Sequence, residues 1–197
     1  MSFDRKKTII EYTLRKEGTK PKKKNKKLRR FQQMIILIAA AIVLGYAFVV
    51  FMFQTVKMVG PSMQGTINEG ETVVISKIGK LLHGVKRNDV VAVKRSNDKY
   101  YSIKRVVGVP GDKVKISGGR LYINGEYYEL KSGDIIVNPG TASSEIELLD
   151  NEYFLLGDNV NNSDDSRFSN LGIVQKTDIT GIAVYRIKPW SKRSKIR

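Results

Sequence analysis

The chain has 197 residues, no cysteine, one histidine and a net charge of +16. This length allows one folded domain with an appendage, and the lack of cysteine excludes disulfides, thiolate zinc sites and cysteine catalysis. The positive charge is concentrated at the start, because residues 1–30 contain thirteen Lys or Arg and only three Asp or Glu.

The first element that we predict is a membrane span at residues 34–53. Its twenty residues, MIILIAAAIVLGYAFVVFMF, carry no charge. As a helix rising about 1.5 Å per residue they extend roughly 30 Å, the thickness of a bilayer core. The apolar run exceeds the ~7–15 residues of a cleaved signal peptide, and no small-x-small cleavage site follows it. We therefore expect an uncleaved anchor.

The charge on either side of the span predicts its orientation. The positive-inside rule keeps the basic segment, residues 1–33, in the cytoplasm and places residues 54–197 outside as a folded domain. A basic block of this kind binds nucleic acid, anionic lipid or only solvent. Because a span follows directly, we interpret it as a topogenic signal that touches membrane lipid, and we expect no nucleic-acid partner.

Beyond the span, short β-branched runs alternate with turn signals, which is typical of strands. Asn124-Gly125 lies between two such runs and predicts a tight hairpin, because both residues tolerate positive φ. Residues 131–150 are weakly patterned and read as a surface excursion. The expected strands are residues 72–76, 89–94, 100–109, 113–117, 120–123, 126–130, 152–157 and 181–187. Long alternating helices are missing from this pattern, so we predict a mostly β domain, a folded-over antiparallel sheet or barrel.

The loop GPSMQGTI, residues 60–67, presents Ser62 as a candidate nucleophile, and two side chains are candidates for its base. His83 has no acidic residue in the few positions around it to orient its ring, so a surface or packing role fits it better. Lys104 and Arg105 lie in an expected strand and point to opposite faces. A lysine that faces apolar neighbours has a lowered pKa and can accept a proton from serine, although a single strand lysine is more often simply exposed.

A third polar stretch, LGDNVNNSDDSR at residues 156–167, follows an expected strand. Asn, Asp, Ser and Gly are common in solvent-exposed turns, where they serve the backbone geometry. The same side chains can also hold a lysine amine and brace a site. Both interpretations are open on this pattern alone.

Taken in order, four segments closely resemble type I signal peptidases in the single-span form of Gram-positive bacteria. They are GPSMQGTI, RNDVVAVK, YSIKRVVGVPGDKV and GDNVNNSDDSR, and the resemblance runs from the span to the C-terminus. It implies a catalytic domain of coiled antiparallel β-sheets with one N-terminal transmembrane helix. It also implies a membrane-anchored serine endopeptidase with a Ser/Lys dyad, which needs no cofactor or metal and cuts secreted preproteins after a small-x-small motif.

The resemblance assigns a role to each matched residue. Ser62 matches the nucleophile and Lys104 the general base. The other matched residues support the site: Ser163 orients the lysine amine, Asp165 and Arg167 form a stabilising pair, Asp158 has a structural role, Arg105 follows the lysine, Met63 packs near it, and Gly60 and Pro61 belong to the oxyanion and substrate loop.

Two positions depart from the family pattern. Gly65 stands where the serine box usually has proline, and Ser102 stands where a large aromatic residue usually precedes the lysine. These departures leave open a non-catalytic or narrowly specialised factor for the assembly of a surface structure such as pili. The span disfavours a third class, the self-cleaving repressors. The C-terminal KPWSKRSKIR is either a solvated tail or a segment that places Trp190 at the lipid interface.

Overall fold

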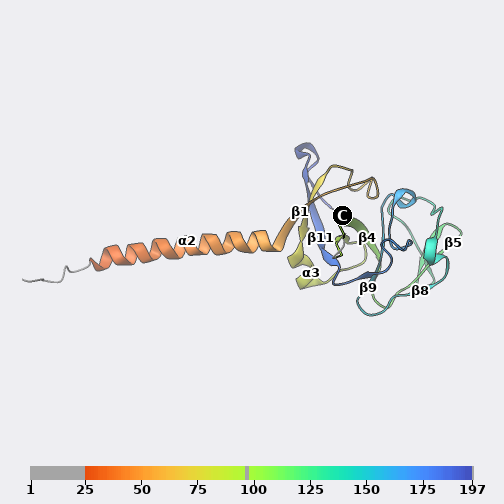
Figure 1. The fold of residues 1–197 in the computed structure, drawn as a ribbon, viewed down its shortest axis with the longest axis horizontal. Coiled ribbons are helices and arrows are strands. Elements are labelled where there is room, and N and C mark those ends of the chain that lie inside the picture. Colours follow the sequence, from red (N-terminus) through yellow and green to blue (C-terminus); the bar gives the residue numbers. More distant parts are fainter. Residues whose placement is uncertain (1–24, 96–97, 197) are drawn as a thin grey trace, which may run out of the picture. The chain divides into compact units, whose positions relative to one another are not determined.

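The computed structural model describes residues 25–95 and 98–196 (Figure 1). These residues divide into two compact units, with the boundary between Phe48 and Val49. The first unit is helical, and the second contains the β-strands.

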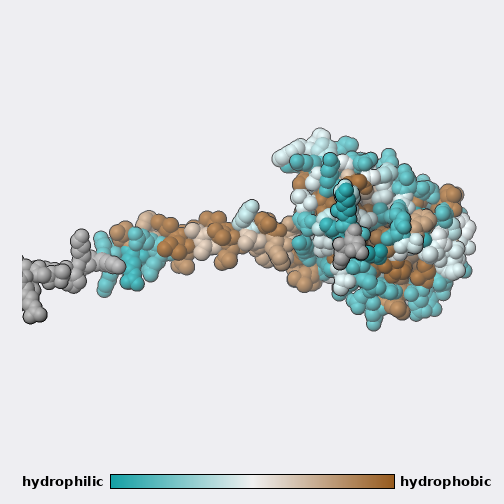
Figure 2. All heavy atoms as spheres, in the orientation of Figure 1, coloured by the Kyte–Doolittle hydropathy of each residue, from teal (hydrophilic) through white to brown (hydrophobic). Residues whose placement is uncertain are grey.

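Helix α2 (Lys26–Met52) contains the expected span apart from its last residue, Phe53, which begins the first strand. None of the helix residues is buried, and its length and apolar composition are sufficient to cross a bilayer. Figure 2 shows a hydrophilic surface at the start of the helix and a largely hydrophobic one along the rest. The remainder of the basic segment, residues 1–24, lies outside the described residues.

The larger sheet is antiparallel throughout, and its order in space differs from its order in sequence. The last long strand, β11, lies between β2 and β3, so it joins the early strands to the later ones. The spatial order is β1 (Phe53–Lys57), β2 (Thr72–Ser76), β11 (Ile179–Lys188), β3 (Val90–Val93), β4 (Ser102–Gly108), β9 (Glu152–Leu156) and β10 (Val174–Gln175), with β12 (Ser194–Lys195) paired to β11.

The smaller sheet has the order β7 (Glu126–Tyr128), β6 (Arg120–Ile123), β5 (Lys113–Ser117) and β8 (Ile146–Glu147). Strand β5 alternates strictly between exposed and buried residues, as expected of a sheet with one face on the core. The predicted hairpin is confirmed, because Asn124 and Gly125 both have positive φ (55° and 82°) and connect β6 to β7.

Strand β4 is the centre of the hydrophobic packing. Its residues Ile103, Val106 and Val107 belong to three different buried clusters. The cluster around Val107 joins the two sheets, and Figure 1 shows the smaller sheet beside β4 and β9. A strand surrounded in this way buries side chains on both of its faces, so both cations of β4 are removed from water.

The predicted fold class, a mostly β domain with a curled antiparallel sheet and an N-terminal apolar helix, is confirmed. Each of the eight expected strands is present, with ends displaced by no more than two residues. Four strands were not predicted: β8, β10 and β12, which have two residues each, and β1, which follows the apolar run without a turn signal. Four short helices complete the described elements: α3 (Lys77–His83), η1 (Gly140–Ser143), η2 (Val160–Asn162) and η3 (Trp190–Lys192).

One local expectation was wrong, and one short helix was missed. The surface excursion at residues 131–150 contains η1 and β8 and buries Ile136, Ala142 and Leu148 in the core between the sheets. The apolar residues of this segment are spaced too irregularly to show the period of an amphipathic helix or that of a strand. His83 is the last residue of α3, a short helix that the sequence pattern did not predict, and Gly84 follows it as the cap.

Two neighbouring leucines in this segment test the packing. Leu148 is 1% exposed and Leu149 is 65% exposed. We expect Leu148→Ala to lower the free energy of unfolding by ~2–5 kcal/mol, because it leaves a cavity. Leu149→Ala should change it by less than about 0.5 kcal/mol. Urea unfolding of the full-length protein in detergent, followed by circular dichroism, measures both, and equal losses would contradict the assigned packing.

Candidate functional site

Ser62 lies in the loop between β1 and β2 and is 8% exposed. The loop turns tightly, with hydrogen bonds from Gln64 N to Pro61 O (2.9 Å) and from Ile67 N to Met63 O (2.7 Å). Met63 and Ile67 are fully buried in the same cluster as Ile103 of β4. These two apolar side chains therefore fix the loop against the core and hold Ser62 beside β4.

Lys104 projects from β4 toward this loop and is 5% exposed. Its Nζ donates a hydrogen bond to Ser62 Oγ over 2.7 Å. The two residues are 42 positions apart in the sequence, so the fold brings them together. Arg105 is also buried and binds a different partner, as expected from the alternation of side chains along a strand.

The surroundings of Lys104 favour the neutral amine. Burial is the largest influence and lowers the pKa of Lys104 from its ordinary value of 10.5, because the charged form loses its hydration. The carboxylates of Asp165 and Asp164 act in the opposite direction, and the charge of Arg167 lowers the pKa further. The loss of hydration exceeds the attraction of the carboxylates, so the net direction is down.

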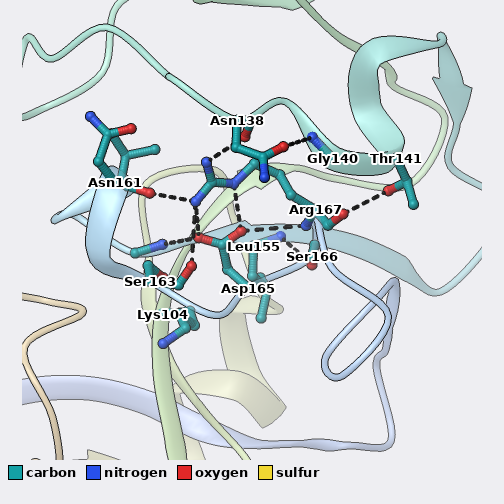
Figure 3. A network of polar contacts seen from close by, with 12 residues as sticks. Lys104, Asn138, Gly140, Thr141, Leu155, Asn161, Ser163, Asp165, Ser166 and Arg167 are labelled. Carbon is teal, nitrogen blue, oxygen red and sulfur yellow. Dashed lines mark hydrogen bonds and ion pairs between the residues drawn. The ribbon is translucent and has the colours of Figure 1, made fainter.

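Asp165 and Arg167 form a buried ion pair behind the lysine (Figure 3). The Arg167 guanidinium donates Nε to Asp165 Oδ1 (2.8 Å) and Nη2 to Oδ2 (2.9 Å), and both side chains are at most 2% exposed. Arg167 also donates to Asn138 O (3.0 Å), and Asp165 accepts a bond from Gly157 N (3.1 Å). A buried pair needs this degree of hydrogen bonding to offset its loss of hydration.

Ser163 lies next to this network and to Lys104 (Figure 3). Its Oγ is buried and makes no hydrogen bond with any residue that the structure describes. The hydrogen bond from Ser163 to the lysine amine, expected from the resemblance, is therefore not formed in this structure. Arg167 reaches only the backbone of Ser163, through its carbonyl oxygen at 3.5 Å.

On the other face of β4, Arg105 forms a second buried ion pair. Its Nε and Nη2 donate to the two carboxylate oxygens of Asp158, each over 2.7 Å. Asp158 also accepts a hydrogen bond from the hydroxyl of Thr66, a residue of the serine loop. This pair therefore connects β4, the loop after β9 and the serine loop.

Sequence reasoning did not single out Gly157 and Asn159. A Cβ at Gly157 would lie 2.2 Å from Ser163 Oγ and 2.4 Å from the carbonyl oxygen of Ser62, so only glycine allows these segments to approach. Asn159 donates its backbone N–H to Ser62 O (3.0 Å) and its side-chain amide to Pro61 O (3.2 Å). The sequence signal that could have identified these two residues is the Gly-Asp-Asn run that directly follows an expected strand.

An open cleft of about 530 Å³ gives access to the Ser62–Lys104 pair. It is lined by residues after β1, residues before and at the start of β4, and the loop that contains Asp164. Its lining includes Met58, Val59, Pro61, Tyr100, Tyr101, Ser102, Asp164 and Asn170. Gly60 lies beside it with its N–H bonded to Glu69 (3.2 Å), and Ser102, in place of a large aromatic residue, forms part of the wall.

The other candidate base, His83, lies apart from this pair. His83 is exposed at the end of α3 and does not line the cleft. Within residues 25–95 and 98–196, no three His, Cys, Asp or Glu side chains are grouped so that they would hold a metal ion. The chemistry that the cleft offers is a serine hydroxyl next to a desolvated amine.

Comparisons with known proteins agree on one family. A family profile described as "Signal peptidase, peptidase S26" matches residues 30–190. A signal peptidase I of Bacillus amyloliquefaciens is 27% identical over 93% of this chain and 100% of its own length, and signal peptidase IB of Staphylococcus aureus is 33% identical over 81% and 91%. A solved signal peptidase I from Enterococcus faecalis is 28% identical and covers 50% of this chain and 95% of its own, with a TM-score of 0.40, too low to compare the folds.

The serine loop depends on Gly65, whose φ is +97°. Proline holds φ near −65°, so Gly65→Pro forces the loop out of its observed conformation. We expect it to lower the free energy of unfolding by about 1–3 kcal/mol and to reduce catalysis, as measured by denaturation and peptide hydrolysis. Gly65→Asn is the control, because asparagine tolerates positive φ better than other residues, and it should lose less. A Gly65→Pro variant as stable as the wild type would contradict this loop geometry.

Proposed function

Because the chain belongs to the signal peptidase family, peptidase S26, it is a serine peptidase, and we propose that Ser62 is its nucleophile and Lys104 its general base. One observation carries the proposal: a buried lysine amine lies 2.7 Å from a buried serine hydroxyl at the base of an open cleft. This distance is within the reach required for direct proton transfer between a base and a nucleophile.

The reaction proceeds through an acyl-enzyme. Ser62 Oγ attacks the scissile carbonyl carbon while Lys104 Nζ takes the hydroxyl proton. Lys104 then returns this proton to the leaving amine, and the peptide C–N bond breaks. Water enters and loses a proton to Lys104 while its oxygen attacks the ester carbonyl carbon. The ester C–O bond then breaks and Lys104 returns the proton to Ser62 Oγ, which releases the acid product and restores Ser62.

The negative charge that develops on the substrate oxygen needs donors that are already in place. We assign this role to the backbone N–H groups of Ser62 and Met63, because Pro61 has no N–H and the N–H of Gly60 donates to Glu69. The hydrogen bonds from Asn159 to the carbonyl oxygens of Ser62 and Pro61 fix this segment of backbone. The ion pairs of Asp158 and Asp165 hold the loop and the lysine in place without entering the reaction.

The substrates are secreted preproteins, as for signal peptidase I in general. Strand β9 pairs with β4 from Arg105 onward, so the edge of β4 at Ser102 and Ile103 faces the cleft. An extended substrate segment adds to this edge through main-chain hydrogen bonds. We propose that this edge presents small side chains of the substrate to the cleft, so that cleavage follows a small-x-small motif.

Helix α2 anchors the enzyme in the membrane in this proposal. The basic residues before the span remain in the cytoplasm, and residues 54–197 lie on the outer side. Strand β1 leads from the helix to the serine loop within a few residues. The nucleophile is therefore tethered close to the membrane surface, where the end of a signal peptide emerges.

The alternative, a non-catalytic or narrowly specialised factor for assembling a surface structure, has no supporting observation. The chain retains both reactive side chains within hydrogen-bonding distance. The relatives reported above are named as signal peptidases. Neither departure, at Gly65 or Ser102, separates the two residues.

Replacing either member of the dyad tests the proposal directly. We expect Ser62→Ala and Lys104→Met each to lower kcat by roughly 10⁴- to 10⁶-fold, the range found when one member of a catalytic unit is removed. The measurement is cleavage of a preprotein by the purified full-length enzyme in detergent. His83→Ala is the matched control and should cleave at the wild-type rate. Activity that survives Lys104→Met but is lost in His83→Ala would assign the base to histidine.

The dependence on pH follows from the state of the lysine. Only the neutral amine accepts the proton, so kcat/KM should rise with pH through the pKa of Lys104, with a midpoint below 10.5. Asp164 raises that pKa, so Asp164→Asn should move the midpoint to lower pH. Asp150→Asn, an equally exposed change outside the cleft, should leave it unchanged. A midpoint that does not move in Asp164→Asn would show that another group controls the profile.

A further inference from the structure

The return half of the serine loop, residues 66–71, contains neither member of the dyad but makes many hydrogen bonds. The loop is closed at its base by two backbone bonds, from Met58 N to Glu71 O (2.8 Å) and from Gly70 N to Met58 O (3.0 Å). Glu71 therefore lies where the loop returns to β2, and it is only 4% exposed. Because carboxylates are rarely buried unless they are paired, its partners indicate what holds the loop.

The Glu71 carboxylate is held by the loop itself and by an arginine. Its Oε2 accepts hydrogen bonds from Asn68 N (3.0 Å) and from Arg186 Nη1 (2.7 Å), and its Oε1 accepts one from Asn68 Nδ2 (3.3 Å). Burial alone would raise the pKa of Glu71, but the hydrogen bonds from Arg186 and Asn68 outweigh it, so the pKa lies below its ordinary value of 4.5. The two side chains therefore form an ion pair at neutral pH.

Arg186 lies in β11 and joins the serine loop to the C-terminal segment. Besides Glu71, its guanidinium binds Thr66 O through Nη1 (3.3 Å), Ser194 Oγ through Nη2 (2.9 Å) and Lys192 O through Nε (2.7 Å). The pairing of β11 with β2 shifts register at this residue, and such irregularities redirect side chains. A planar group that is bonded through all three of its nitrogens has little freedom to move.

Thr66 connects Arg186 to the nucleophile. Its carbonyl oxygen accepts a bond from Arg186, its hydroxyl donates to Asp158, and its N–H donates to Met63 O (3.0 Å). Met63 directly follows Ser62 and supplies one of the N–H groups that we assign to the developing oxyanion. A displacement of Thr66 would therefore move both the nucleophile and this donor relative to β4.

We propose that Arg186, paired with Glu71, is a positioning residue that holds Ser62 within hydrogen-bonding distance of Lys104. The inference rests on the proposed roles of Ser62 and Lys104. Neither Arg186 nor Glu71 lines the cleft, so both act through the serine loop and do not touch the substrate.

A positioning role and a purely structural role predict different pH profiles. If the serine loop loosens, water reaches Lys104, its charged form regains hydration, and its pKa rises toward 10.5. The charged groups that act on Lys104, which are Asp164, Asp165 and Arg167, are unchanged in such a variant. Loss of positioning therefore lowers kcat and moves the midpoint of the kcat/KM profile to higher pH. Loss of a purely structural contact lowers the stability and leaves the midpoint where it is.

Arg186→Met in the full-length enzyme tests this difference, and Arg87→Met is the matched control. Arg87 also binds a buried carboxylate, that of Asp112 (2.9 Å), and a backbone carbonyl oxygen, that of Val107 (2.7 Å). We expect Arg186→Met to lower kcat by about 10²-fold, the loss that a small misplacement of reacting groups can cause, and to raise the midpoint. Arg87→Met should retain the wild-type kcat and midpoint. Peptide hydrolysis in detergent is measured against pH, at a temperature at which circular dichroism shows each variant to be folded.

Two further variants test the ion pair itself. Arg186→Lys keeps the charge opposite Glu71 but loses the planar fork that reaches Thr66 and the C-terminal segment together, so we expect a smaller loss of kcat and a shift of the midpoint in the same direction. Glu71→Gln should also lower kcat. Adding it to Arg186→Met should cause little further loss, because residues that act as a pair are not additive. Losses that multiply in the double variant would contradict the pairing.

The midpoint decides the outcome. An unchanged midpoint in both Arg186→Met and Arg186→Lys would overturn the inference and assign Arg186 to the stability of the fold alone. If Arg186→Met does not fold, Arg186→Lys alone decides. An equal shift in Arg87→Met would also overturn it, because the effect would not be specific to the serine loop. The proposed function is tested separately, because it fails if Ser62→Ala or Lys104→Met retains activity, whatever the result at Arg186.

Discussion

The removal of one lysine amine from water is the constraint on which the rest of the site depends. Lys104 is only 5% exposed. The free energy that its charged form loses on dehydration can be offset only if the amine becomes neutral or if carboxylates lie close to it. Two carboxylates lie near enough to oppose the loss, but Asp165 is already engaged with Arg167. The partner within hydrogen-bonding distance is a hydroxyl, Ser62, which suits an amine that in the proposed reaction alternates between its two protonation states.

Arg105, the neighbouring cation on β4, is held by an ion pair with a carboxylate instead. Arg105 is as deeply buried as Lys104, yet both oxygens of Asp158 accept bonds from its guanidinium. A bidentate pair of this kind is strong and fixed in direction, and through Thr66 it also holds the serine loop. The Arg105 face of β4 therefore makes the site rigid, and the Lys104 face carries the amine of the proposed reaction. Arginine, which stays charged, suits the first role, and lysine, which can lose its proton, suits the second.

Much of this arrangement was predictable from local patterns. Alternation along residues 100–109 put Lys104 and Arg105 on opposite faces, and Asn124-Gly125 predicted its hairpin correctly. Local patterns do not show which segments, far apart in the sequence, come close together in the fold. The need for glycine at position 157 arises only because Ser62 and Ser163 both come within a Cβ's reach of it. The hydroxyl of Ser163, which has no hydrogen-bond partner among the described residues, is likewise enclosed by this close approach and not by its own sequence neighbours. The short strands β8 and β10 exist because their partners are present, not because of their own two residues.

The position of β11 in the sheet has a consequence for the chain while it is being synthesised. The serine loop precedes β2, and the lysine lies in β4, which pairs with β3. Among the described strands, these two groups are joined in the sheet only through β11, which follows all of them in the chain. While the chain is being synthesised, Ser62 and Lys104 therefore belong to groups of strands that are not yet paired with each other. The Ser62–Lys104 pair is complete in the sheet only after β11 has paired with β2 and β3, so a partly synthesised chain lacks the geometry on which the proposed catalysis depends.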